Sequence, residues 1–272
     1  MTRSRDVAAR YDVIWSRFDQ QYADDRPWHF ESIAHLLPLE LIRGRVLELG
    51  CGSGRDAAYL GRLGCDVVAV DLSDEAVRAA VRRAQRLAAF HVVQADLQEL
   101  PLADRSFDVV YSYGALHHLG SPERGLAEAL RVLRPGGLAV AYVYEDLTER
   151  SAVERKLLSA VKRIRCVTTK MPPRLVYGLC TALAPPAWAL LTVPAHILNR
   201  WGATSVIARR IPLRYGTGPL AVRGDLYDRF ATPIEFRYSR RAVERWFGGA
   251  GLTDVQVFYR DGWVAVGQAP GG

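Results

Sequence analysis

The sequence is poor in cysteine, and its four cysteines show no pairing pattern. Cys51, Cys65, Cys166 and Cys180 form neither a C-x-x-C motif nor a spacing typical of metal ligands. A disulfide framework and a structural zinc site therefore have no support, and we expect no metal. The N-terminus lacks the apolar run of a signal peptide and carries charge where such a peptide would begin. We therefore expect a protein of the reducing cytoplasm.

Internal repeats and low-complexity tracts are also missing, and the bulk composition is that of an ordinary globular protein. Hydrophobic residues make up 49% and charged residues 24% of the 272 residues, which argues against disorder and against a fibrous class. The net charge of +7 is unevenly placed, because residues 146–238 contain 15 Lys and Arg but only 6 Asp and Glu. The basic character belongs to this one segment.

Short apolar runs alternate with helical patterns from residue 45 onward. Buried parallel strands are expected at residues 46–49, 66–70, 91–93, 108–111 and 138–143. Helices are expected between them, for example after the capping residues Ser73 and Ser121. This alternation predicts an α/β fold with a Rossmann-like, doubly wound and mostly parallel sheet.

The end of the chain predicts a different strand arrangement. A helix over residues 239–247 leads into a hairpin over 254–266, which adds an antiparallel pair and brings the sheet to seven strands. Residues 146–237 interrupt the scheme after the fifth strand. We expect an N-terminal helical cap segment at 1–44, a Rossmann-like domain at 45–145 and 238–270, and a basic, partly apolar and mainly helical insertion at 146–237 over the ligand edge of the sheet.

A glycine-rich turn follows the first expected strand and opens a helix. Gly50, Gly52 and Gly54 permit a tight turn and a close approach of the backbone to a nucleotide-like ligand. Arg55 stands where the dinucleotide fingerprint requires glycine, and no Lys-Ser/Thr follows to form a P-loop. Asp71, 21 residues after Gly50, either accepts hydrogen bonds from both hydroxyls of a ribose or caps the next helix.

A further acid follows the third expected strand. Asp96 is placed to accept from an adenine amino group while Leu97 packs on the ring, with a turn or cap role as the alternative. The chain continues as FDVVYSYGALHHL at 107–119 and RVLRPGG at 131–137.

With these motifs, the sequence resembles the class I S-adenosylmethionine-dependent methyltransferases, in particular the branch similar to ubiquinone-biosynthesis enzymes (methyltransferase type 11). The resemblance covers residues 44–144 and the closing helix and hairpin. It implies S-adenosylmethionine as cofactor and S-adenosylhomocysteine as product. It also implies that Glu48 and the three glycines hold the methionine end, that Asp71 binds the ribose, and that Asp96 and Leu97 hold adenine. The other residues expected at the cofactor are Cys51, Leu72 and Ser112.

Methyl transfer from a sulfonium is an in-line displacement, so the site mainly aligns the acceptor and excludes water. A base is needed only if the acceptor carries a proton, and His117 or His118 is the candidate, with packing in the loop as the alternative. Tyr11 is expected at the cofactor, or else packs on the core together with Trp15. The candidate acceptor contacts are Tyr113, Tyr227 and Asp228, against a role in anchoring loops.

The expected activity is methylation of a small-molecule acceptor that is hydrophobic or acidic, such as a secondary metabolite. Oxygen is favoured over nitrogen or carbon as the methylated atom. The same fold serves nicotinamide-dependent oxidoreductases, although Arg55 argues against that class. A cofactor-binding module without catalysis is a third interpretation.

Residues 175–199 contain no Asp, Glu, Lys or Arg. Three prolines in this run argue against a helix that crosses a membrane. Basic residues on both sides would attract anionic headgroups or a lipid-like acceptor, so the run is expected to be an apolar lid, or a lid that also contacts a membrane peripherally. Nucleic acid is not expected as a partner, because the basic residues bracket apolar rather than interleaved aromatic surface.

Overall fold

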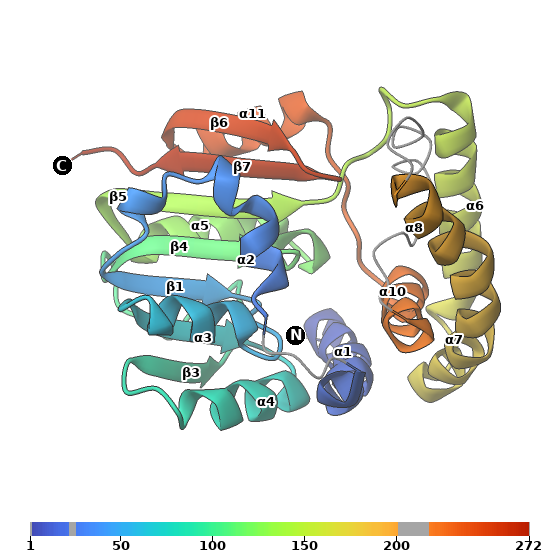
Figure 1. The fold of residues 1–272 in the computed structure, drawn as a ribbon. Coiled ribbons are helices and arrows are strands. Elements are labelled where there is room, and N and C mark those ends of the chain that lie inside the picture. Colours follow the sequence, from blue (N-terminus) through green and yellow to red (C-terminus); the bar gives the residue numbers. More distant parts are fainter. Residues whose placement is uncertain (1, 22–25, 201–217, 272) are drawn as a thin grey trace.

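The computed structural model describes residues 2–21, 26–200 and 218–271. A seven-stranded sheet lies at its centre, in the order β3-β2-β1-β4-β5-β7-β6 (Figure 1). Strands β1 to β5 are parallel, and β7 lies antiparallel between β5 and β6. The predicted doubly wound sheet with a C-terminal hairpin is therefore confirmed. The strands are β1 (Arg45–Leu49), β2 (Asp66–Asp71), β3 (Phe90–Gln94), β4 (Phe107–Tyr113), β5 (Leu133–Val143), β6 (Thr253–Tyr259) and β7 (Trp263–Gln268).

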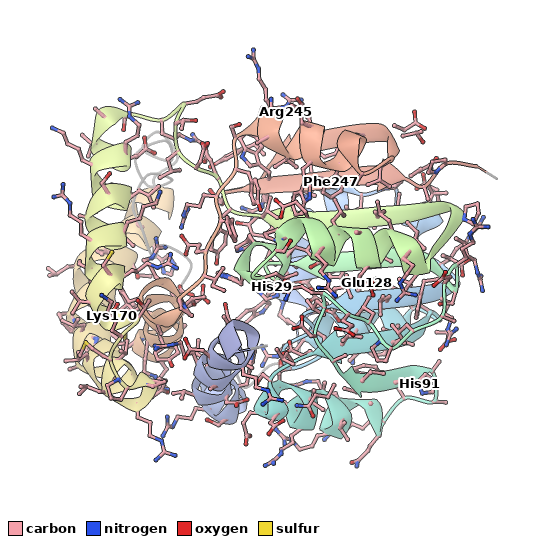
Figure 2. All side chains as sticks on the ribbon, turned by 180° about the vertical axis from the view of Figure 1, so that it is seen from behind. His29, His91, Glu128, Lys170, Arg245 and Phe247 are labelled. Carbon is pink, nitrogen blue, oxygen red and sulfur yellow. The ribbon has the colours of Figure 1, made fainter. Side chains whose placement is uncertain are left out.

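Helices cover both faces of the sheet because alternate residues of each buried strand point to opposite sides. Val46 packs in a cluster with residues of α2 (Trp28–Ile33), α3 (Arg55–Arg62) and α4 (Asp74–Ala84). Leu47 packs in the opposite cluster, with α5 (Pro122–Val132) and α11 (Arg240–Gly249). Figure 2 shows the latter face, with Glu128 on α5 and Phe247 on α11. Short 3-10 turns lie at Ala34–Leu36, Leu39–Leu41 and Leu116–His118.

A separate group of helices lies beyond the carboxyl ends of the parallel strands, toward which their arrowheads point in Figure 1. It comprises α1 (Thr2–Gln21), α6 (Ala152–Thr168), α7 (Pro173–Ala187), the π-helical turn Trp188–Thr192, α8 (Val193–Arg200) and α10 (Pro219–Ala231). Helices α1, α7 and α10 share an apolar cluster of their own around Ile14, Val176 and Leu226. The amino-terminal helix therefore packs against helices more than 150 residues later in the chain.

The chain leaves the sheet and returns to it at neighbouring points. The Tyr238 N–H donates to the Tyr144 carbonyl at 2.9 Å, and the Asp146 N–H donates to the Tyr238 carbonyl at 3.0 Å. The helices between these residues are thus tied at both ends to the edge where ligands bind in sheets of this kind.

Within the described ranges, one helical segment is long and apolar enough to cross a membrane by length and composition. It runs over the 26 residues Pro173–Leu198, from α7 into α8. Its most apolar window is 28% buried inside the protein.

Candidate active site

A cavity of about 1460 Å³ lies between the strand ends and the second group of helices. Its walls come from the loops after the five parallel strands and from α1, α2, α6 and α10. This is the crevice at the carboxyl ends of the strands where open α/β sheets bind their ligands. Of the cofactor residues expected from the sequence, those on its wall are Tyr11, Glu48, Gly50, Cys51, Gly52, Asp71, Leu72, Asp96 and Leu97.

The glycine turn after β1 is held against the neighbouring strand. The N–H groups of Gly50 and Cys51 both donate to the carbonyl of Val70 on β2, at 2.8 and 3.1 Å. Gly52 has a φ of +52°, and a Cβ there would lie 2.5 Å from the indole of Trp15 on α1. Glycine is thus required at this position both for the backbone conformation and for the approach of the amino-terminal helix.

Glu48 presents an unpaired acceptor at this turn. Its side chain is 5% exposed, and its Oε2 has no hydrogen-bond partner among the described residues. Burial raises the pKa of this carboxyl well above its ordinary value, and the charges of Asp56 and Asp71 raise it further. A buried carboxylate oxygen without a donor is costly, so the position suits a cationic ligand group such as an ammonium. The methionine end of S-adenosylmethionine carries such a group, and the residues present fit it.

Asp71 organises the turn with both of its carboxylate oxygens. It accepts from the N–H of Gly52 and from the N–H of Ser73, each at 2.9 Å. The cap of α4 is Ser73, whose Oγ accepts from the Ala76 N–H, so Asp71 itself is not the helix cap. Asp71 also lines the cavity. Burial raises the pKa of Asp71, while the backbone donors lower it.

The remaining residues expected at the cofactor differ in whether they line the cavity. Asp96 Oδ1 accepts from the Gln98 N–H at 2.9 Å, and both Asp96 and Leu97 face the cavity. Gly54 and Ser112 are not part of the cavity wall. Gly54 precedes α3 and packs beside Ala80, and the Ser112 hydroxyl donates to the Leu49 carbonyl at 3.1 Å. These two support the turn and the strand end from behind.

The two adjacent histidines differ in position. His117 is fully buried, does not line the cavity, and has no partner for either ring nitrogen among the described residues. Burial and the neighbouring His118 hold the pKa of His117 well below its ordinary value, so its ring is neutral. The structure thus does not place His117 where it could act on an acceptor.

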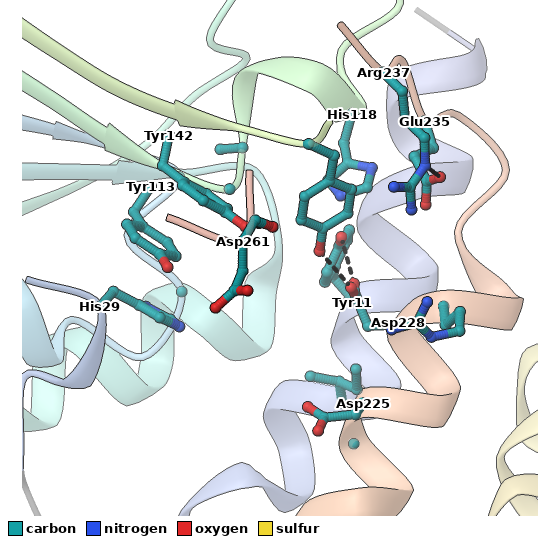
Figure 3. A pocket seen from close by; sticks show the side chains of 18 of the residues that line it. Tyr11, His29, Tyr113, His118, Tyr142, Asp225, Asp228, Glu235, Arg237 and Asp261 are labelled. Atoms are coloured by element: carbon teal, nitrogen blue, oxygen red, sulfur yellow. Dashed lines mark hydrogen bonds and ion pairs between the residues drawn. The ribbon is translucent and has the colours of Figure 1, made fainter. Parts of the chain in front are cut away.

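His118 lies on the cavity wall, with its Nδ1 2.7 Å from the carbonyl oxygen of Ile234 (Figure 3). A carbonyl oxygen can only accept, so the neutral ring carries its proton on Nδ1. Nε2 then holds the free lone pair. His118 therefore has the tautomer that a general base requires.

Tyr11 of α1 and Asp228 of α10 lie next to each other on one side of the cavity, as Figure 3 shows. The Tyr11 hydroxyl donates to Asp228 Oδ1 at 2.9 Å, and the Tyr144 hydroxyl donates to Oδ2 at 3.0 Å. Burial first, and then the Asp228 carboxylate, raise the pKa of both tyrosines well above the ordinary value, so both stay protonated donors. Tyr227 points away instead, because it is buried among α1, α7 and α10 and donates to the Arg10 carbonyl. Of the candidate acceptor contacts, Asp228 and Tyr113 line the cavity and Tyr227 does not.

A row of aromatic rings on the wall was not anticipated from the sequence. His29 stacks on Tyr113 at a centroid distance of 4.5 Å, and Tyr113 stacks on Tyr142 at 4.2 Å. Figure 3 shows these three rings opposite Tyr11 and Asp228. The rings come from three elements, and only the end of β4 gave a sequence signal.

An ion network in the insertion was also missed. Glu235, whose side chain is 3% exposed, pairs with Arg165 of α6 at 2.5 Å and with Arg237 at 2.6 Å. The Arg237 guanidinium lies 5.0 Å from the centre of the Tyr144 ring. Arg165 lies 70 positions before Glu235, and Tyr144 lies 93 positions before Arg237, so no local pattern could have linked these pairs. Among the residues described, no group of three or more His, Cys, Asp or Glu side chains could hold a metal ion.

Comparisons with known proteins agree with this geometry. Residues 47–141 match the family described as "Methyltransferase domain". A malonyl-[acyl-carrier protein] O-methyltransferase of Enterobacter lignolyticus is 45% identical over 35% of this chain and 36% of its own length. A fatty-acid O-methyltransferase of Mycolicibacterium smegmatis is 36% identical over 43% of each chain. Across the first of the curated relatives, this chain spans 60% or less of the relative's length.

A solved structure extends the likeness in fold to nearly the whole chain. It is a SAM-dependent methyltransferase of Thermotoga maritima, described as a possible histamine N-methyltransferase. The two share 16% identity and a TM-score of 0.54, over 96% of this chain and 98% of that one. The strand order and this likeness show the fold of the class I S-adenosylmethionine-dependent methyltransferases, and residues 47–141 match the methyltransferase domain within it.

Proposed function

We propose that this protein transfers the methyl group of S-adenosylmethionine to a small-molecule acceptor. The observation that carries the proposal is the buried, unpaired Oε2 of Glu48, which shares one cavity with the glycine turn and with His118. When bound, the cofactor supplies an electrophilic methyl group on its sulfonium. Glu48 would accept from its ammonium group, Asp71 from its ribose hydroxyls and Asp96 from its adenine amino group, with Leu97 packed on the ring.

His118 is the residue we propose as general base. Its Nε2 lone pair would take the proton of an acceptor hydroxyl while Ile234 holds the Nδ1 proton in place. Tyr11 and Tyr144, fixed on Asp228, would position the acceptor. We also propose that residues 1–44 and 146–237 act as cap and lid, because α1, α6 and α10 supply the wall opposite the strand ends and exclude water there.

The acceptor we propose is hydrophobic and is methylated on oxygen. Apolar side chains of α6 and α10 line the cavity away from the glycine turn, including Leu158, Val161 and Phe230. The names of the acyl-carrier-protein and fatty-acid O-methyltransferase relatives agree with an acceptor of this kind. A strongly anionic acceptor is disfavoured inside the cavity, whose wall carries ten Asp and Glu but four Arg residues.

An amine is the second candidate acceptor, and that excess of carboxylates favours it. The stacked rings of Tyr113 and Tyr142 add a surface that attracts cations. The chemical shift of the transferred methyl group in the product distinguishes an O-methyl ester or ether from an N-methylated amine.

Two measurements test the proposal. Calorimetric titration should show binding of S-adenosylhomocysteine and none of NADH, whereas preference for NADH would overturn it. Turnover is then measured on hydroxyl-bearing apolar acceptors with His118→Gln and, as the matched control, His117→Met. His118→Gln should lower turnover by roughly a hundredfold or more with cofactor affinity unchanged, while His117→Met keeps both. Equal turnover of the two variants would remove the base from the mechanism.

A further inference from the structure

The outer faces of α6 and α7 carry large apolar side chains that are exposed in the described part of the chain. Both helices form the side of the molecule farthest from the sheet, in Figure 1 and from behind in Figure 2. On α6 the exposed apolar residues are Val153, Leu157, Ala160, Ile164 and Val167. They are spaced alternately four and three residues apart, so they form one stripe along the helix. Val153 is 75% and Val167 62% exposed.

Helix α7 presents a second apolar face. Its inner side packs Val176, Tyr177, Cys180 and Ala184 against the rest of the helical group. After Arg174 in its first turn, the exposed side contains no charged residue, and Leu175, Leu179, Leu183 and, just beyond the helix, Leu190 are between 45% and 74% exposed. Four exposed leucines at helical spacing are more than the scattered surface apolar residues of an ordinary soluble helix.

The charges around these faces are almost all of one sign. Residues 152–200 contain eight Lys and Arg but a single acid, Glu154, which is engaged in the capping box of α6. Exposed cations lie beside the α6 stripe and at the turn into α7, where Figure 2 labels Lys170; they are Arg155, Lys156, Lys162, Arg163, Lys170 and Arg174. An apolar face flanked by cations is complementary to a surface that offers anionic groups above an apolar layer.

We infer that the outer face of α6 and α7 docks on an anionic lipid bilayer, with both helices lying in the interface. The surroundings of α7 argue against a crossing, because its inner side packs against α1 and α10. The guanidinium groups of Arg17 and Arg223 also lie 4.6 and 4.8 Å from the ring of Tyr177, near the start of the helix. Insertion would carry both charges into the hydrocarbon layer. An interfacial position buries the exposed leucines and leaves these arginines outside.

One residue of α6 belongs both to the exposed stripe and to the cavity wall. Leu157 is 51% exposed on the stripe and also lines the cavity, together with its neighbours Glu154, Leu158 and Val161. If the proposed methyl transfer holds, an amphiphilic acceptor could pass from the bilayer along α6 to His118 without crossing water. The docking itself does not depend on that activity, so the two can fail independently.

The test is vesicle co-sedimentation of the full chain without cofactor. Vesicles of phosphatidylcholine alone are compared with vesicles that also contain phosphatidylglycerol, at about 0.1 M and about 1 M salt, where the Debye length falls from about 10 to about 3 Å. Binding should appear on the anionic vesicles alone and should weaken at high salt. Absence of binding, or equal binding to neutral vesicles, overturns the inference.

Two sets of substitutions separate the contributions. Lys156→Gln, Lys162→Gln and Arg163→Gln together should weaken binding to anionic vesicles by roughly a hundredfold. Val153→Ser, Ile164→Ser and Val167→Ser together should weaken it by about tenfold or more. None of these six residues lines the cavity. Affinity for S-adenosylhomocysteine therefore serves as the check that each variant is folded.

The matched control is Arg62→Gln with Leu63→Gln, an exposed cation and an exposed leucine at the end of α3. This pair should bind vesicles like the wild type, and a loss equal to that of the α6 variants would overturn the assignment to α6 and α7. Sedimentation equilibrium without lipid tests a second copy of the chain as the occupant. A dimer that the Val153, Ile164 and Val167 substitutions dissolve would also overturn the inference.

Discussion

Replacement of Glu48 by glutamine should weaken cofactor binding and stabilise the free protein at the same time. Glutamine keeps the size of the side chain and one carbonyl acceptor but removes the charge. In the free protein the carboxylate is buried beside Asp56 and Asp71, and its Oε2 has no partner among the described residues. In the complex the same oxygen would face an ammonium. A charged hydrogen bond of this kind contributes about 1.5–3 kcal/mol, so affinity should fall by roughly tenfold to a hundredfold.

The effect on stability has a definite dependence on pH. Burial raises the pKa of Glu48 above its ordinary value of 4.5, so the unfolded chain releases this proton at a lower pH than the folded chain. The wild-type protein therefore loses stability as the pH rises from the unfolded value through the folded value. Below pH 4.5 the side chain is protonated in both states and contributes no such loss. Glu48→Gln removes this titration, so its advantage in stability should grow with pH.

The assays are titration calorimetry with S-adenosylhomocysteine and urea unfolding of the free protein at several values of pH. Glu40→Gln serves as the matched control, because this glutamate is exposed and does not line the cavity. Glu40→Gln should change neither the affinity for S-adenosylhomocysteine nor the free energy of unfolding. If Glu48→Gln binds S-adenosylhomocysteine like the wild type, then the assignment of the unpaired oxygen to the ammonium group is refuted. If its stability relative to the wild type does not change with pH, then the raised pKa of the buried carboxyl is refuted.

Three further predictions follow from contacts around the same cavity. Asp71→Asn should lower affinity for S-adenosylhomocysteine by roughly tenfold to a hundredfold in calorimetry, since one of the two oxygens that order the turn becomes a donor; unchanged affinity would contradict the ribose assignment. Gly52→Ala should destabilise the protein by about 1–3 kcal/mol in urea unfolding, because the φ of +52° is unfavourable for alanine and the methyl group would meet Trp15. Burial depresses the pKa of His117 below 6.5, so the wild type should lose stability as the pH falls below that value, and His117→Met should remove this part of the loss. A pH profile of unfolding that is the same in both proteins would contradict the neutral, unpaired ring.

The sheet could be predicted from the sequence because its signals are local. Each central strand is a short apolar run buried on both faces. Ser73 caps α4, which follows β2, and Ser121 caps α5, which lies between β4 and β5. The hairpin turn at residues 260–262 also has a local signal. Strand order then follows from right-handed crossovers between parallel strands, which leave few alternatives. The glycine turn and Asp71 could be placed for the same reason, since the carboxyl ends of parallel strands meet at one edge.

The acceptor side of the cavity was not predictable in the same way. From the sequence, His117 and His118 were equivalent candidates for the general base. Only the tertiary structure distinguishes their positions, because His118 contacts the carbonyl of Ile234 while His117 is fully buried. Tyr227 and Asp228 are adjacent in the chain, yet α10 turns one into the helical core and the other into the cavity.

By itself the sequence determined the sheet, the position of the glycine turn and the acids at the strand ends, because apolar periodicity and turn chemistry act over a few residues. The tertiary structure alone decided which side chains face one another across the cavity. Contacts such as Tyr11 to Asp228, or Arg165 to Glu235, join segments separated by 217 and 70 residues. No periodic sequence pattern indicates such pairs, because their geometry depends on how α1, α6 and α10 pack over the strand ends.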